Sequence, residues 1–208
     1  MYNPWLEIDL SDYVNHMSSP EVGQYQMISE CFNNILSKLQ PKRIFVPGCT
    51  IGNGFEYINW KNVDRVTALD INPHFLQVLR ERFPAEEKLE IVNSDFNLLK
   101  AKDLEYDLIF AALFFEYVDV HSSLIKIRGM MGNSSVLFSI IQLPASGQSK
   151  VSESKFKSLE KLSPYISLTS SEEFVRELKK AGLKIKDSSI RTLVNGKSFL
   201  ISEAIKIK

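Results

Sequence analysis

The chain has 208 residues, of which 44% are hydrophobic and 24% charged, so it can bury a sizeable core as one globular domain. Lysine plus arginine equals aspartate plus glutamate at 25 each, which argues against a nucleic-acid binder that works through a broad positive surface. No apolar run approaches the roughly 18 residues of a membrane span, no signal peptide is evident, and the two cysteines lack metal-knuckle spacing, so we expect a cytoplasmic protein.

The first 41 residues differ in pattern from the rest of the chain. Residues 21–39 have apolar positions at helical spacing, which predicts a helix that packs on the main domain. The upstream residues are rich in aromatics but have no clear period, and we interpret them as an arm laid over that domain. We therefore divide the chain into an arm and helix, 1–41, and a main domain, 42–208.

From residue 42 onward, short β-rich runs alternate with helical patterns. We predict strands at 43–47, 65–70, 88–95, 106–115 and 134–143, with helices at 73–83 and 118–131 between them. This alternation predicts a doubly wound α/β fold whose sheet is mostly parallel and has helices on both faces.

The C-terminal part changes character. A polar, Ser/Lys-rich stretch at 146–161 is interpreted as a loop or mobile helix over one edge, and residues 169–183 as a helix capped by Ser170 or Ser171. Two strand-like runs, 183–193 and 197–208, are joined by an Asn-Gly turn, a strong hairpin signal. We therefore expect seven strands, the last two forming an antiparallel hairpin.

The stretch VPGCTIGNGFEY, residues 46–57, follows the first predicted strand and contains Gly48, Gly52 and Gly54. Its glycine order matches neither the dinucleotide fingerprint G-x-G-x-x-G nor the P-loop. By itself it predicts a tight turn between a strand and a helix that cradles a nucleoside or a phosphate.

Acidic residues follow the next two predicted strands. In an open parallel sheet, ligands bind outside the carboxyl ends of the strands, so Asp70 and Asp95 are placed near the glycine turn. A carboxylate at Asp70 suits a ribose diol, and Asp95 beside Phe96 suits the edge and face of an adenine. The alternative is that Asp70 caps the helix that starts near Pro73 and that Asp95 caps a turn.

The four segments VPGCTIGNGFEY, VTALDINPHFLQVLRERF, EIVNSDF and YDLIFAALFFEYVD resemble, in that order, the motifs of class I S-adenosylmethionine-dependent methyltransferases. The resemblance covers about residues 40–208. It implies S-adenosylmethionine as cofactor and S-adenosylhomocysteine as product, with residues 1–41 covering the cofactor site. The residues that it assigns to the cofactor are Gly48, Gly52 and Gly54 near the methionine moiety, Asp70 at the ribose, and Ile71, Asp95 and Phe96 around the adenine.

Two positions depart from the family pattern. Val46 stands where the family usually has an acid, which removes one anchor for the ammonium of the cofactor. Thr50 stands at a usual glycine, which requires either a negative φ or a shifted loop. The Thr50 hydroxyl is also a candidate to bond the cofactor carboxylate.

The reaction that the resemblance implies is an in-line displacement, for which the protein mainly supplies proximity, orientation and desolvation. A general base helps when the acceptor is a hydroxyl or a protonated amine. The candidates are His16 with Tyr13 in the arm, and Glu116 with Tyr117 after the fourth strand. For His16 the alternative is an arm residue that is merely packed against the domain.

The acceptor is expected to be a small organic molecule. Residues 112–115 are Ala-Leu-Phe-Phe rather than the Asn-Pro-Pro-Tyr typical of family members that methylate nucleobase or glutamine nitrogens, and no Asp-Asp-Asn metal cluster is evident. We expect no metal, no nucleic-acid or membrane partner, and a monomer or homodimer. Two alternatives stay open: a non-catalytic protein of this fold that binds the cofactor as a sensor or partner subunit, and an NAD-type oxidoreductase, which the glycine spacing disfavours.

Overall fold

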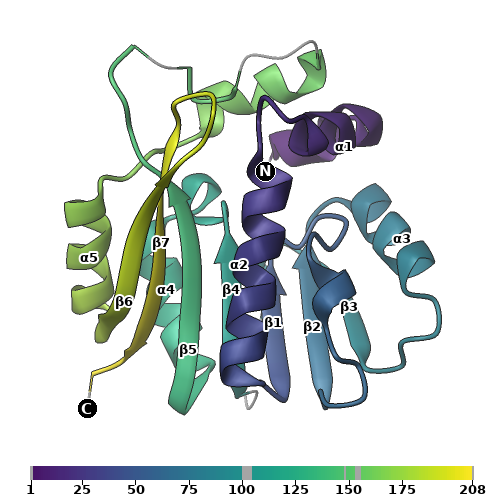
Figure 1. Ribbon diagram of the computed structural model, residues 1–208, viewed down its shortest axis with the longest axis vertical. Helices are drawn as coiled ribbons and strands as arrows, with labels where there is room; N and C mark the ends of the chain where they lie inside the picture. The colour runs from purple at the N-terminus through teal and green to yellow at the C-terminus, as the bar shows by residue number, and fades with distance from the viewer. Residues whose placement is uncertain (1, 100–104, 148, 153–155, 208) are drawn as a thin grey trace.

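Seven strands form one sheet in a computed structural model that describes residues 2–99, 105–147, 149–152 and 156–207 (Figure 1). The strand order is β3-β2-β1-β4-β5-β7-β6, in which β1 to β5 are parallel and β7 runs antiparallel between β5 and β6. This confirms the predicted doubly wound fold with its antiparallel hairpin. The strands are β1 (Arg43–Pro47), β2 (Arg65–Asp70), β3 (Leu89–Asn93), β4 (Tyr106–Ala112), β5 (Met131–Gln142), β6 (Leu183–Thr192) and β7 (Ser198–Lys206).

Helices cover both faces of the sheet because its central strands are apolar on both sides. On β1, Ile44 and Val46 belong to one buried core, and the intervening Phe45 belongs to the other. The first core is closed by α2 (Gln24–Leu39) and α3 (Pro73–Arg82), and the second by α4 (Val120–Gly129) and α5 (Ser171–Lys180). None of the described helices is both long and apolar enough to cross a membrane.

Local signals place most element ends within a few residues of the prediction. Ser170 caps α5 through a capping box with Glu173, and the Asn-Gly turn joins β6 to β7. The fourth strand is shorter than predicted, ending at Ala112 instead of residue 115. Leu113 takes a positive φ of 52°, which turns the chain into the 3₁₀ helix η4 (Phe115–Tyr117).

The N-terminal segment contains structure that the sequence pattern did not predict. A 3₁₀ helix, η1 (Pro4–Glu7), is followed by α1 (Leu10–Ser18), whose N-cap is Asp9. A further 3₁₀ helix, η5 (Lys157–Tyr165), lies within and beyond the stretch predicted as a loop or mobile helix, of which residues 148 and 153–155 lie outside the described residues.

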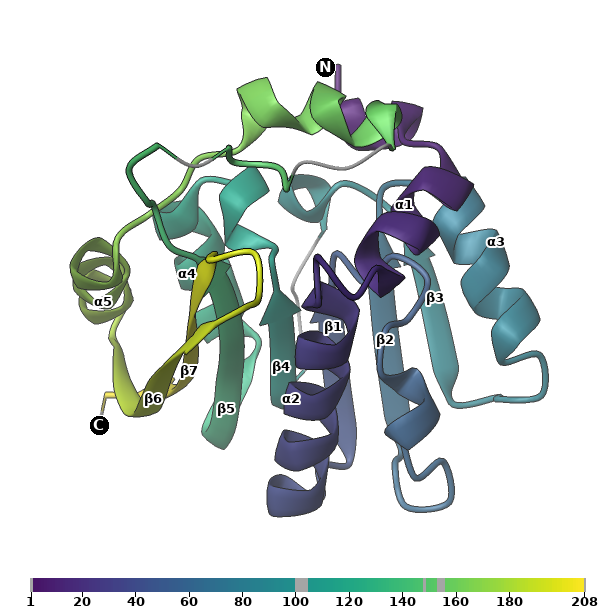
Figure 2. The ribbon, with the colours of Figure 1, turned by 45° about the horizontal axis from the view of Figure 1, so that its top comes forward.

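The segments η1–α1 and η5 lie side by side above the carboxyl ends of the strands (Figure 2). They are joined by hydrogen bonds: the Ser158 amide donates to Asp12 Oδ2 at 2.9 Å, and the Asp9 amide donates to Ser158 Oγ at 3.3 Å. Two parts of the chain that are distant in sequence thus form one cover.

Candidate functional site

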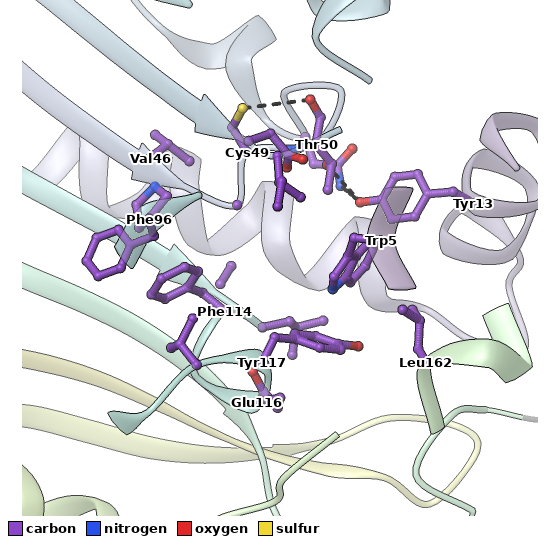
Figure 3. A pocket seen from close by; sticks show the side chains of 18 of the residues that line it. Trp5, Tyr13, Val46, Cys49, Thr50, Phe96, Phe114, Glu116, Tyr117 and Leu162 are labelled. Atoms are coloured by element: carbon purple, nitrogen blue, oxygen red, sulfur yellow. Dashed lines mark hydrogen bonds between the residues drawn. The ribbon is translucent and has the colours of Figure 1, made fainter. Parts of the chain in front are cut away.

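A cavity lies between this cover and the carboxyl ends of β1, β2, β3 and β4 (Figure 3). Figure 3 shows Phe96 and Phe114 toward one side and Tyr13 and Trp5 toward the other, with Glu116 beside Tyr117. Of the sequence-predicted site residues, Gly52 and Gly54 do not line this cavity. The others all do: Tyr13, His16, Gly48, Thr50, Asp70, Ile71, Asp95, Phe96 and Glu116.

The three loop glycines have different roles. Gly48 lines the cavity, whereas Gly52 and Gly54 face the protein interior. A Cβ added to Gly52 would lie 2.5 Å from Leu79 Cδ1, and one added to Gly54 would lie 3.0 Å from Phe32 Cδ1. The last two glycines therefore allow the loop to pack closely against helices and do not line the cavity.

Thr50 adopts the left-handed backbone conformation that favours glycine. Its φ is +49°, so the expected alternative of a negative φ is wrong, whereas the alternative of a shifted loop stays a prediction. Two hydrogen bonds hold it: its amide donates to Asp70 Oδ2 at 2.8 Å, and its hydroxyl pairs with the Tyr13 hydroxyl at 2.9 Å. These contacts offset the strain of a β-branched residue in this region.

Asp70 lies buried at the end of β2. Its other oxygen, Oδ1, accepts from the Asn72 amide at 2.8 Å, so both carboxylate oxygens are held by backbone amides. The N-cap of α3 is Asn72, whose Oδ1 accepts from the His74 amide at 2.9 Å, which excludes the alternative of Asp70 as that cap. Burial raises the pKa of Asp70 to about 6 despite these bonds. The Ile71 amide also favours the charged form, so about one of the roughly four lone-pair sites of the carboxylate stays open to a ligand hydroxyl.

The end of β3 adds a polar and an aromatic group. Asp95 Oδ1 accepts from the Asn97 amide at 2.8 Å and caps the short 3₁₀ helix η3 (Phe96–Leu98), so the alternative of a turn cap is realised here. Phe96 is buried and packs edge-to-face against Phe114 at 5.0 Å between ring centroids. Phe96, Phe114 and Ile71 all line the cavity. Asp95 lines it beside them, although its carboxylate also caps η3.

Glu116 lies on the other side of the cavity, where its side chain is 5% exposed overall. Its Oε1 accepts from the backbone amide of Gln142 at 2.6 Å, and its Oε2 is buried without a hydrogen-bond partner in the described structure. Burial raises the pKa of Glu116 to about 7, close to the value that suits a general base at neutral pH.

The two arm candidates, Tyr13 and His16, are neutral at pH 7. Burial raises the pKa of Tyr13 to about 12, and its hydroxyl accepts from Asn53 Nδ2 at 2.9 Å. Burial, with a smaller contribution from the nearby Lys197 cation, lowers the pKa of His16 to about 4. His16 is therefore a weaker base than Glu116 at neutral pH.

Comparison with known proteins gives the family context of this cavity. Residues 46–138 match the model of a methyltransferase domain, and no curated protein sequence matches the chain significantly. The chain has a class I, Rossmann-like methyltransferase fold. The matched segment runs from the glycine loop to β5 and so contains the predicted cofactor residues.

Several solved structures share this methyltransferase fold at low sequence identity. The N-methyltransferase NodS from Bradyrhizobium japonicum WM9, in complex with S-adenosyl-L-homocysteine, is 13% identical over 99% of this chain and 97% of that chain, with a TM-score of 0.74. The CcbJ methyltransferase from Streptomyces caelestis is 12% identical over 100% of both chains, with a TM-score of 0.73. The [4+2]-cyclase SpnF is 10% identical over 86% of this chain and 81% of that chain, with a TM-score of 0.68.

Three cavity residues of this methyltransferase fold were missed by sequence reasoning. Trp5 packs edge-to-face against Tyr117 at 5.0 Å, and no periodicity in the arm marked it. Asn53 lines the cavity with its Oδ1 buried and without a partner in the described structure; its position between two loop glycines was an available signal. Gln142 ends β5, and its amide positions Glu116.

Proposed function

We propose that this protein transfers the methyl group of S-adenosylmethionine to a small-molecule acceptor by in-line displacement. The observation that carries the proposal is Asp70, a buried carboxylate fixed by two backbone amides at the strand end where a ribose diol fits, in the same cavity as Asp95 and Phe96. The methyl–sulfur bond breaks as the bond to the acceptor forms, and its electron pair stays on sulfur. The protein contributes orientation and exclusion of water.

The methionine end of the cofactor needs a substitute for the acid that Val46 replaces. Asn53 supplies a buried acceptor atom without a partner in the described structure, Oδ1, and its amide nitrogen is already fixed by the Tyr13 hydroxyl. An unpaired buried acceptor is costly, so a ligand donor at this atom is favoured. We assign Asn53 Oδ1 to the cofactor ammonium.

The acceptor end is enclosed by the arm and η5. Trp5, Tyr117 and Leu162 line it with apolar surface, which suits a small organic acceptor and provides aromatic faces for the positive sulfonium. A large polymer such as a nucleic acid does not fit the near-zero net charge of the chain.

Calorimetry with S-adenosylmethionine and, separately, NADH tests the proposal. We expect the first to bind and the second not to bind; the reverse would refute it in favour of an oxidoreductase. Asp70→Asn should weaken S-adenosylmethionine binding by at least ~1.5 kcal/mol, because a charge-assisted hydrogen bond to the ribose is lost.

The matched control is Asp107→Asn. Asp107 also accepts two backbone amides, from Lys42 and Arg43, but it lies at the opposite end of the sheet. Its replacement should leave cofactor affinity unchanged. An Asp70→Asn protein that binds as tightly as this control would refute the ribose assignment.

A second function, cofactor binding without catalysis, is favoured by the departures at Val46 and Thr50. The similarity to a [4+2]-cyclase also illustrates that one fold hosts different chemistry. Tight S-adenosylmethionine binding with no S-adenosylhomocysteine formed on a broad acceptor panel would favour this second function.

A further inference from the structure

The acceptor side of the cavity, where we propose that the methyl acceptor binds, contains a buried carboxyl group, Glu116, without a cationic partner among the described side chains. Glu116 Oε2 has no hydrogen-bond partner among the described residues, and none of their lysines or arginines lowers the pKa of this carboxyl group. The Gln142 backbone amide fixes the other oxygen, and Oε2 itself has almost no exposed surface, so a small rotation of the carboxylate brings Oε2 to a ligand. An unpaired buried charge is strongly unfavourable, and a ligand cation at Oε2 would relieve that cost.

The surroundings of this oxygen favour a cation with an apolar body. Tyr117 lies beside Glu116 (Figure 3) and packs edge-to-face against Trp5, with 5.0 Å between ring centroids; aromatic faces attract an ammonium group. Leu162 and Ile166 are buried and complete an apolar wall. Lys150, the cationic residue of this wall, donates from Nζ to the Ile166 carbonyl at 2.7 Å.

Charge and proton affinity separate the chemical classes of acceptor. An alcohol or a phenol would leave the carboxylate charge uncompensated, whereas an ammonium neutralises it. An ammonium must also lose a proton before its nitrogen can attack. Proton transfer to a carboxylate with a pKa of about 7 is unfavourable by roughly 10³-fold for an alkylammonium or a phenol but by roughly 10⁹-fold for a water-like hydroxyl. Proton affinity therefore disfavours an alcohol, and the charge argument alone disfavours a phenol.

We infer that the methyl acceptor is a small apolar molecule with a primary or secondary amine, and that Glu116 binds this ammonium and accepts its proton. The inference rests on the proposed methyl transfer. One N–H bond breaks and the proton moves to Glu116 Oε2. The freed nitrogen lone pair then attacks the methyl carbon, and the carbon–sulfur electron pair stays on sulfur, which gives a methylated ammonium and S-adenosylhomocysteine.

The test compares isosteric probes on the full chain saturated with S-adenosylhomocysteine. Calorimetry measures the binding of phenethylamine, 2-phenylethanol and 4-ethylphenol. We expect the amine to bind at least ~10-fold more tightly than either hydroxyl compound, from a charge-assisted contact. Glu116→Gln should abolish this preference while S-adenosylhomocysteine affinity stays the same, and Glu90→Gln on β3 is the control that should keep the preference.

A measurement on the unmodified protein avoids dependence on how the variant folds. Glu116 ionises as pH rises through about 7, whereas an alkylammonium stays charged, so the amine preference should rise roughly tenfold between about pH 6 and about pH 8. The other titratable groups that line the cavity are Tyr13, His16, Cys49, Asp70, Asp95, Tyr117 and Lys150. Asp70, with a pKa of about 6, titrates within the same range, so S-adenosylhomocysteine is kept saturating at both pH values. Of these, Tyr13, His16 and Tyr117 have pKa values displaced away from this range.

Equal affinity for amine and alcohol, tighter binding of the phenol, or a preference that survives Glu116→Gln would overturn the inference. Failure of S-adenosylhomocysteine to bind is a separate result, because it removes the proposed methyl transfer itself and the inference with it. The first set of outcomes leaves the cofactor site intact and changes only the class of acceptor.

Discussion

The cavity has a proposed cofactor side, which contains Asp70, and a proposed acceptor side, which contains Glu116. The two sides differ in how their buried carboxylates are hydrogen-bonded. Asp70 has a backbone amide on each oxygen, both from residues within the turns that follow β1 and β2. Glu116 has one amide, from the distant end of β5, and one oxygen without a described partner. The fold preorganises the first group, whereas it leaves one oxygen of the second unpaired, and we propose that the substrate ammonium binds there.

Backbone strain also marks both sides. Thr50 follows β1 on the cofactor side and Leu113 follows β4, and both line the cavity with positive φ values of 49° and 52°. Non-glycine residues in this region are uncommon and concentrate at functional sites. The two sides therefore share strain but differ in how completely their polar atoms are paired.

The largest expected effect tests whether Gly52 in the glycine loop serves packing or ligand binding. Gly52→Ala should destabilise the fold by roughly 3 kcal/mol or more, because φ is +77° and the new Cβ would lie 2.5 Å from Leu79 Cδ1. Chemical denaturation measures the loss. Since Gly52 does not line the cavity, S-adenosylmethionine affinity of the folded fraction should change little.

Gly129→Ala is the control for this glycine substitution. Gly129 lies in α4 with nothing within 4 Å of an added Cβ, so alanine there should be neutral or stabilising by about 0.5–1 kcal/mol. A Gly52→Ala protein of normal stability but low cofactor affinity would show that the loop interior does face the ligand.

The next effect tests whether the acceptor side really holds an uncompensated carboxylate. The pKa of Glu116 is raised from 4.5 to about 7, so the folded state holds its proton more tightly than the unfolded state. Its contribution to stability is therefore full below about pH 4.5 and is lost as pH rises through about 7. Glu116→Gln should raise the free energy of unfolding at about pH 8 by on the order of 1–3 kcal/mol and leave it unchanged near pH 4.

Urea denaturation at the two pH values, without ligand, measures this difference. Glutamine keeps the oxygen that accepts from the Gln142 amide, so packing is preserved. A variant that is less stable than the wild type at about pH 8 would mean that Glu116 has a stabilising partner and would break the contrast with Asp70. If Glu116→Gln both stabilises the protein at about pH 8 and abolishes amine binding, then Glu116 is a functional group that is kept at a cost in stability.

The cofactor side was predictable from sequence because its determinants are local. Apolar strands end where polar residues begin, and parallel strands bring those ends to one edge, so Asp70, Asp95 and Phe96 follow from the pattern. The same logic did not indicate that Gly52 and Gly54 lie outside the cavity lining, since a glycine required for close packing looks identical in sequence to one required by a ligand.

The acceptor side depended on contacts between distant segments. The helix α1 escaped prediction because the upstream residues showed no clear period, and it packs partly on η5, which is more than a hundred residues away. Glu116 was identified from its place after β4, but its unpaired oxygen depends on the path of β5 and η5. Such pairing is a property of the assembled fold and has no signature within a short window of sequence.

The smallest expected effect concerns the contact that links the two sides, the hydrogen bond between the Thr50 and Tyr13 hydroxyls. Thr50→Gly removes backbone strain worth about 1–2 kcal/mol, but it also removes this bond and adds unfolded-state entropy, each worth about 1 kcal/mol. We therefore expect a net change in unfolding free energy close to zero. In a Tyr13→Phe background the bond is already absent, so Thr50→Gly should be more favourable by about 1 kcal/mol.

A double-mutant cycle, measured by denaturation, isolates this coupling. Tyr25→Phe is the matched control because the Tyr25 hydroxyl bonds to Glu56 on the surface, and its effect should add to that of Thr50→Gly without coupling. Full additivity for Tyr13 as well would show that the contact contributes nothing to stability and that the arm is held by its packing alone. Coupling near the expected value would identify Thr50 as the residue that ties the arm to the cofactor loop, which explains why a threonine occupies a backbone conformation otherwise suited to glycine.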